Sequence, residues 1–121
     1  MILSIFLFIT SVFFQTQPGV KNINQAEFQK LQADKNTIVI DVRTPEEIKQ
    51  GYIKGTTQFI DINGANFDAK INSLDKNKTY LMVCHSGGRS SKAAKIMISK
   101  GFKKVYNLSG GVSGWSGPLT K

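Results

Sequence analysis

Two short segments, residues 37–42 and 80–83, are apolar along nearly their whole length. A strand with one solvent-facing side alternates between polar and apolar residues, so continuous runs predict strands that are buried on both faces. Residues 58–60 and 105–108 indicate two further strands. Strands of this kind belong to parallel sheets whose two faces are covered by helices, so the fold class predicted is α/β.

Helix signals stand between these strands, as the connections of a parallel sheet require. Residues 24–34 begin with the side chains of a capping box, and residues 44–51 begin with a cap followed by proline and two glutamates. Residues 67–74 and 88–100 indicate two more helices, the second of which ends at a glycine. Strands and helices therefore alternate along the chain.

Cys84, the only cysteine, follows the buried run 80–83 directly and opens a glycine-rich segment that leads into a helix. In parallel sheets the functional site lies beyond the carboxyl ends of the strands. Backbone N–H groups and a helix N-terminus at that point stabilise an anion, which here is the Cys84 thiolate. The alternative is a small buried hydrophobe, and that environment suits mid-strand better than a glycine-rich loop.

The first nineteen residues differ in composition from the rest. Residues 2–14 are almost entirely apolar, and no charge precedes Lys21. Such a run is short for a membrane span and is typical of a secretory signal. Because no basic residue precedes it and no clean cleavage site follows, a retained anchor or a misassigned start codon stays open. We expect residues 1–19 to be a signal peptide or anchor with a short linker, and residues 20–121 to form the domain. An exported protein, periplasmic or otherwise extracytoplasmic, is expected.

The net charge of +8 comes from 16 Lys and Arg against 8 Asp and Glu, and only two of the 16 are Arg. Scattered lysine is typical of a solvated surface, and no cluster of Arg with aromatics predicts nucleic-acid binding. A single cysteine and a single histidine exclude an internal disulfide and leave too few ligands for a zinc site. We expect no metal or cofactor, and membrane contact only through a retained N-terminal segment.

Three separated segments together resemble a single-domain rhodanese, a family of thiosulfate sulfurtransferase-like proteins. They are Asp-Val-Arg-Thr-Pro-Glu-Glu at 41–47, Gly-Tyr-Ile-Lys-Gly at 51–55, and Cys-His-Ser-Gly-Gly-Arg-Ser at 84–90 with the closing Gly110, Gly111 and Trp115. Their order and spacing match over nearly all of residues 21–117. The resemblance implies a three-layer α/β/α domain with a central, mainly parallel sheet of about five strands. A monomer is expected.

The resemblance also implies a reaction. Cys84 attacks the outer sulfur of a donor such as thiosulfate, carries it as a persulfide, and passes it to cyanide or a thiol. A protein acceptor also stays open. The substrate side of this site is a cup formed by the N–H groups from His85 through Ser90, which include Ser86, Gly87 and Gly88. The two glycines are expected to permit the backbone dihedrals that turn these groups inward.

The remaining candidate residues support the cup. Arg89 is expected to favour the thiolate and to pair with an anionic donor. Ser90 is expected to cap the helix or to donate one hydrogen bond into the cup. Asp41 and Arg43 are expected to form an ion pair that organises the active-site side of the fold. His85 is expected to shape the rim rather than act as a base, because adjacent side chains on a turn diverge.

The chain departs from the family pattern at three positions. Tyr52 stands where the family commonly has histidine, and Thr56 stands where alanine is usual. His85 occupies a position that is often arginine, which makes the pocket less positive and leaves the donor open. The large aromatics Trp115, Tyr106 and Phe102 are expected to belong to the core.

Two other functions compete with sulfur transfer by an enzyme. Phosphatases and arsenate reductases of the same general fold have five residues between cysteine and arginine, whereas four separate Cys84 from Arg89. The smaller loop disfavours a tetrahedral oxyanion. The second alternative is a persulfide carrier or sulfur-relay module that does not turn over free thiosulfate, because a fold does not fix a function.

Overall fold

The computed structural model describes residues 19–121, so the expected leader or anchor lies, except for Gly19, outside the described residues. Eleven elements follow one another in this part of the chain: β1 (Lys21–Ile23), α1 (Gln25–Gln32), β2 (Thr37–Asp41), α2 (Pro45–Lys49), β3 (Tyr52–Ile53), β4 (Gln58–Phe59), α3 (Phe67–Asn72), β5 (Thr79–Val83), α4 (Gly88–Ser99), β6 (Lys104–Leu108) and β7 (Leu119–Thr120).

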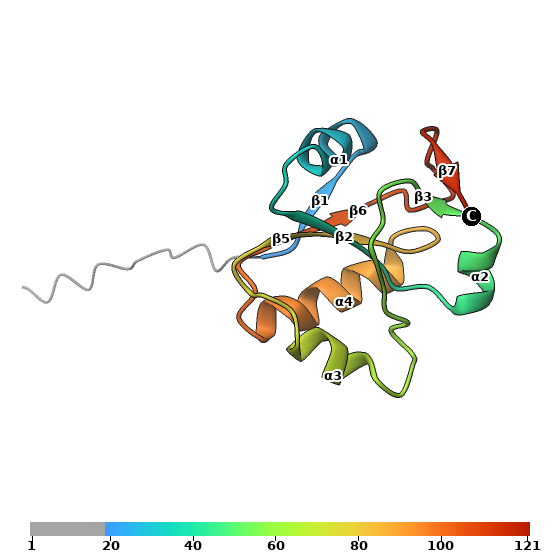
Figure 1. Cartoon of the computed structure of the whole chain (residues 1–121). Helices are drawn as coiled ribbons and strands as arrows, with labels where there is room; N and C mark the ends of the chain where they lie inside the picture. The colour runs from blue at the N-terminus through green and yellow to red at the C-terminus, as the bar shows by residue number, and fades with distance from the viewer. Residues whose placement is uncertain (1–18) are drawn as a thin grey trace, which may run out of the picture.

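The central sheet has five strands in the order β1-β6-β5-β2-β4, and every neighbouring pair is parallel. Helix α1 covers one face of this sheet, and α3 and α4 cover the other (Figure 1). The predicted three-layer α/β/α architecture is therefore confirmed. A second, two-stranded antiparallel sheet of β3 and β7 lies beside α2 (Figure 1).

The helix starts follow from the sequence signals that predicted them. At α1, Asn24 Oδ1 accepts the N–H of Glu27 at 2.9 Å while the Glu27 side chain accepts the N–H of Asn24 at 3.3 Å. Thr44 and Glu47 form the same reciprocal pair at α2, which has Pro45 in its first turn. Both capping boxes satisfy N–H groups that have no partner within the helix.

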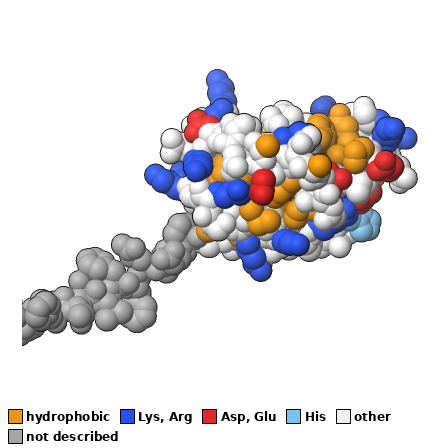
Figure 2. Space-filling view, turned by 90° about the horizontal axis from the view of Figure 1, so that it is seen from below, with side chains coloured by type: hydrophobic (Ala, Val, Ile, Leu, Met, Phe, Trp, Pro, Cys, Tyr) orange, Lys and Arg blue, Asp and Glu red, His pale blue; other side chains and the backbone are white. Residues whose placement is uncertain are grey.

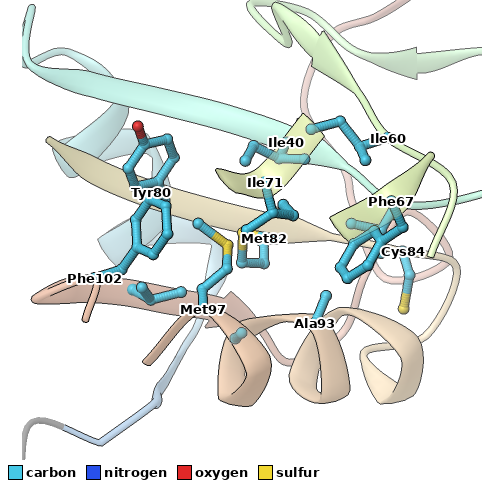
Figure 3. Close-up of a cluster of buried hydrophobic side chains, with 13 residues drawn as sticks. Ile40, Ile60, Phe67, Ile71, Tyr80, Met82, Cys84, Ala93, Met97 and Phe102 are labelled. Carbon is cyan, nitrogen blue, oxygen red and sulfur yellow. The ribbon is translucent and has the colours of Figure 1, made fainter. Parts of the chain in front are cut away.

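The two buried strands are apolar throughout because successive residues enter different cores. Ile40 and Met82 belong to the cluster between the sheet and the helices α3 and α4, shown in Figure 3. Val39 and Leu81 belong to the cluster on the α1 side. Side chains alternate across a strand, so a strand covered on both faces needs an apolar residue at each position. Each such side chain contributes roughly 1.5–3 kcal/mol when it is fully buried.

The large aromatic side chains, and the residues that depart from the family pattern at positions 52 and 56, have packing or hydrogen-bond partners nearby. Phe102 is buried, and Trp115 packs edge-on against Phe28 with ring centroids 5.3 Å apart. Tyr52 packs edge-on against Phe59. The buried Thr56 hydroxyl donates to the Ile53 carbonyl at 2.7 Å, so its polar group is satisfied. Tyr106 packs, partly buried, against the α1-side cluster.

A buried ion pair fixes the carboxyl end of β2, as the sequence predicted. Arg43 Nη2 lies 2.8 Å from Asp41 Oδ2, and Arg43 Nε lies 3.0 Å from Asp41 Oδ1. The same guanidinium donates to the Gly51 carbonyl at 2.8 Å. Asp41 is fully buried and Arg43 nearly so. The pair therefore joins the end of β2 to the start of β3, on the side of the sheet where Cys84 lies.

We expect Arg43→Met to lower the free energy of unfolding by about 3–5 kcal/mol, because it leaves the buried Asp41 carboxylate without a cation. Urea unfolding followed by the fluorescence of Trp115 measures this loss. Adding Asp41→Asn is expected to restore part of it, since the amide removes the charge and still accepts the backbone N–H of position 43. A loss below about 1 kcal/mol for Arg43→Met would contradict a structural role for the pair.

Candidate active site

Cys84 lies where β5 ends and the loop to α4 begins, and its side chain points toward the first turn of α4 (Figure 3). Its Sγ accepts the backbone N–H of Gly87 at 3.1 Å and faces the Ser90 hydroxyl at 3.2 Å. Only 1% of the residue is exposed. The thiol is thus enclosed by the loop that follows it, and Ser90 takes the second of its two predicted roles.

Hydrogen bonds lower the pKa of this thiol. Burial raises the pKa of Cys84, but hydrogen bonds from the Ser90 hydroxyl and from the backbone N–H groups of Ser90, Gly87 and Ser86 outweigh it. The result is a pKa below the ordinary value of 9.0. Fixed N–H dipoles of this kind favour the anion over the neutral thiol. Three N–H groups of the predicted cup therefore act on the sulfur.

Two glycines let the loop close around the sulfur. Gly87 has φ +101° and Gly111 has φ +58°, a region that favours glycine. A Cβ at Gly87 would meet the Ser109 carbonyl oxygen at 2.4 Å, and one at Gly111 would meet the His85 carbonyl oxygen at the same distance. For Gly88 the dihedral prediction is wrong: its φ is not positive, and a Cβ there would contact nothing, because Gly88 is already the first residue of α4.

Arg89 is held by a carboxylate rather than left free. Its Nη1 and Nη2 donate to the two oxygens of Glu47 at 2.7 and 2.8 Å, with both side chains 32% exposed. The hydrogen bonds from Arg89 are the main reason that the pKa of Glu47 falls to about 2, and those bonds raise the pKa of Arg89. From the sequence, Glu47 is predicted only as a helix-start residue. The sequence did offer one signal that Glu47 belongs to the site: it lies within 41–47, one of the three segments that resemble the family.

A cleft of about 430 Å³ opens beside the loop. It is lined by polar and charged side chains together with one glycine and two apolar side chains: Arg43, Glu47, Gln50, Gly51, His85, Arg89, Val112 and Leu119. His85 is exposed on this cleft, as expected for a rim residue. On the face drawn in Figure 2, the chain's one histidine lies at an end of the molecule near acidic side chains, while Lys and Arg side chains are scattered. Cys84 itself is not a lining residue.

Asn107 contacts the same Ser90 hydroxyl that faces the Cys84 sulfur, and it was not predicted from the sequence as a site residue. Asn107, on β6 and 2% exposed, accepts a hydrogen bond from the Ser90 hydroxyl at 2.5 Å. Its amide nitrogen donates to the Gly87 carbonyl at 3.1 Å and to Asn22 Oδ1 at 2.9 Å. Asn107 lies between Tyr106 and Leu108 in the predicted strand 105–108, and a polar residue in that position was the available signal, because buried polar groups need partners.

Fold and site together define a single-domain α/β protein with a cysteine loop at the carboxyl edge of its parallel sheet. The family model described as Rhodanese-like domain matches residues 24–118, and the chain belongs to this family. The resemblance carried by the three sequence segments is thus confirmed.

Named relatives agree with the family model. YtwF of Bacillus subtilis, provisionally named a sulfurtransferase, is 37% identical over 81% of this chain and 92% of its own length. The thiosulfate sulfurtransferase GlpE of Pseudomonas entomophila is 32% identical over 78% of this chain and 84% of its own length. A crystal structure of a rhodanese-like domain protein from Staphylococcus aureus, 33% identical, superposes with a TM-score of 0.69 over 84% of this chain and 97% of that one. The chain is therefore related to proteins named for sulfur transfer.

Residues 19–121 lack two features, a cluster of metal-binding side chains and a membrane-spanning helix. No group of three or more His, Cys, Asp or Glu side chains in this range is arranged to hold a metal ion. None of the helices described is both long and apolar enough to cross a bilayer.

The glycines of the loop give a matched pair of variants. Gly87→Ala is expected to lower the free energy of unfolding by about 3 kcal/mol, because alanine meets both an unfavourable φ and the Ser109 carbonyl. Gly88→Ala is expected to stay within about 0.5 kcal/mol of the wild type. Urea unfolding of both variants measures the difference. Equal effects at the two positions would show that the loop does not have this backbone conformation.

The Glu47–Arg89 pair predicts a specific acid sensitivity. The pKa of Glu47 is about 2 when folded against 4.5 ordinarily, so its contribution to stability is fully present above pH 4.5. It is lost as the pH falls toward 2. The free energy of unfolding of the wild type is expected to exceed that of Glu47→Gln at pH 6, and this gap is expected to close in acid.

Unfolding in urea at a series of pH values between 2 and 6 measures this gap. Glu46→Gln is the control, because Glu46 lies in the same helical turn and has no ion pair within residues 19–121. A gap for Glu47→Gln that persists unchanged to the lowest pH would contradict the assigned pairing.

Proposed function

We propose that this protein is a sulfurtransferase that moves a sulfane sulfur from a donor such as thiosulfate to cyanide or a thiol through a persulfide on Cys84. The observation that carries the proposal is the Cys84 sulfur itself, which is enclosed by N–H donors and has a lowered pKa. The comparisons support sulfur transfer in general. The donor, the acceptor and the persulfide are our assignment.

The reaction requires only the one thiol that the chain has. In the first step, the Cys84 thiolate attacks the outer sulfur of thiosulfate, the sulfur–sulfur bond of the donor breaks, and sulfite leaves with the bonding electron pair. In the second step, cyanide or a thiolate attacks the outer sulfur of the persulfide, and Sγ leaves as a thiolate. A low thiol pKa favours this second step because it makes Sγ a better leaving group.

The loop would stabilise the charge at both stages. The N–H groups that now surround the Cys84 sulfur are fixed dipoles that need no rearrangement when the negative charge moves to the outer sulfur. Arg89 keeps N–H groups beyond the two that Glu47 occupies, because a guanidinium has five. These groups and His85, which line the cleft, are our candidates for contacting the donor.

The carrier function is favoured by one observation. Both arginines that line the cleft are paired with carboxylates, Arg43 with Asp41 and Arg89 with Glu47. Neither guanidinium is a free cation for a dianionic donor. A neutral or protein-bound persulfide does not need one, so a sulfur-relay role remains our second candidate.

The test is a steady-state assay with purified protein, thiosulfate and cyanide, in which thiocyanate is measured. Turnover is expected for the wild type and is expected to disappear in Cys84→Ser, which is close in size but lacks the thiolate. Intact-mass analysis after donor alone is expected to show an added mass of about 32 Da, one sulfur atom, in the wild type only.

The other outcomes separate the alternatives. An adduct without thiocyanate, whichever donor is offered, would favour the carrier. Hydrolysis of an aryl phosphate at a comparable rate would overturn the sulfur assignment.

We also propose that residues 1–19 direct export or anchor the protein. The intact mass of protein made in cells shows whether these residues are removed.

A further inference from the structure

The Ser90 hydroxyl has two acceptors but a single proton to donate. Its Oγ lies 3.2 Å from Cys84 Sγ and 2.5 Å from Asn107 Oδ1. Ser90 is fully buried and Asn107 is 2% exposed. Because a hydroxyl carries one hydrogen, Ser90 donates to either the sulfur or the amide oxygen at any moment.

The orientation of the Asn107 amide is fixed by its other contacts. The two hydrogens of Nδ2 are directed to the Gly87 carbonyl at 3.1 Å and to Asn22 Oδ1 at 2.9 Å. Turning the amide over would place Oδ1 against the Gly87 carbonyl oxygen, and two acceptors would then face each other. The atom that faces Ser90 is therefore Oδ1, which only accepts.

We propose that Asn107 is a positioning residue that competes with Cys84 for the single proton of the Ser90 hydroxyl and thereby limits how strongly the loop holds negative charge on the sulfur. The inference deepens the proposed function, because it concerns the same sulfur. Its test measures the Cys84 thiol directly, so it does not depend on whether thiosulfate is turned over.

Whether the Ser90 hydroxyl donates to Cys84 or to Asn107 depends on the charge of the Cys84 sulfur. When Sγ is a thiolate, the charge makes it the stronger acceptor, and the Ser90 O–H turns to it. Asn107 Oδ1 then loses its donor, which is costly for a buried carbonyl. When Sγ is neutral, as a thiol or as the inner sulfur of a persulfide, the O–H returns to Asn107. The proton stays on Ser90 throughout, and only its direction changes.

Asn107 therefore favours the states in which Sγ carries no charge. Removing it frees the Ser90 hydroxyl for the sulfur and is expected to lower the pKa of Cys84. Removing the Ser90 hydroxyl is expected to raise that pKa. Removing the Ser90 hydroxyl and removing Asn107 thus shift the pKa of Cys84 in opposite directions. A simple loss of packing at the two positions does not produce opposite shifts.

The charged and titratable groups around the loop and its cleft are the same in every variant of this test. They are Arg89 on α4, Glu47 on α2, His85 in the loop, and the Asp41–Arg43 pair at the end of β2. Differences in the pKa of Cys84 between the variants therefore report the hydrogen bonds and not a change of charge.

The experiment follows the ultraviolet absorbance of the thiolate against pH in the full chain, where Cys84 is the only cysteine. For Asn107→Leu, which is similar in shape and apolar, the pKa is expected to fall by about 0.5–1, a three- to tenfold larger acid constant. For Ser90→Ala it is expected to rise by a similar amount. Ser91→Ala, at the next position of α4, is the matched control and is expected to leave the pKa unchanged.

A double variant separates competition from disturbance of the loop, because Asn107→Leu also removes the donor to Gly87. In the Ser90→Ala background there is no proton to compete for, so Asn107→Leu is expected to leave the pKa unchanged. An equal shift with and without the Ser90 hydroxyl, or a rise in the pKa for Asn107→Leu alone, would overturn the proposal. If Asn107→Leu does not fold, Asn107→Val, which suits strand β6, serves the same comparison.

Discussion

The N–H group of Gly87 that points at Cys84 Sγ is the contact on which the rest of the site depends. It is aimed by a positive φ that glycine adopts readily, and the loop is held in place from outside by backbone hydrogen bonds. Val112 N donates to the Cys84 carbonyl and Ser113 N donates to the His85 carbonyl, each at 2.9 Å. The sheet sets the position of the thiol, and the N–H groups of the loop lower its pKa although it is buried.

Each of the two arginines near the cysteine loop is paired with a carboxylate. Arg43 pairs with Asp41 and joins the end of β2 to the start of β3, and Arg89 pairs with Glu47 and joins α4 to α2. The negatively charged form of the sulfur is then favoured by backbone N–H groups and one hydroxyl, which buried contacts hold in position. Because oriented dipoles are less affected by salt than free charges, the site is suited to chemistry at the sulfur itself.

Much of this arrangement was predictable from local sequence, because local signals determine it. The capping box of α1, the cap and proline at the start of α2, the buried strands and the position of Cys84 after β5 were expected and are observed. Strands β1, β3 and β7 were not predicted, since they are only two or three residues long and exist through pairing with distant segments. Glu47 and Asn107 were missed as site residues for the same reason: their partners Arg89 and Ser90 lie 42 and 17 residues away.

This fold makes a buried thiol more acidic, against the effect of burial alone. The pH dependence of Cys84 alkylation, in the folded protein and in the same protein unfolded in urea, measures this directly. We expect a lower pKa in the folded protein, because hydrogen bonds outweigh burial. A folded pKa equal to or above the unfolded one would contradict it.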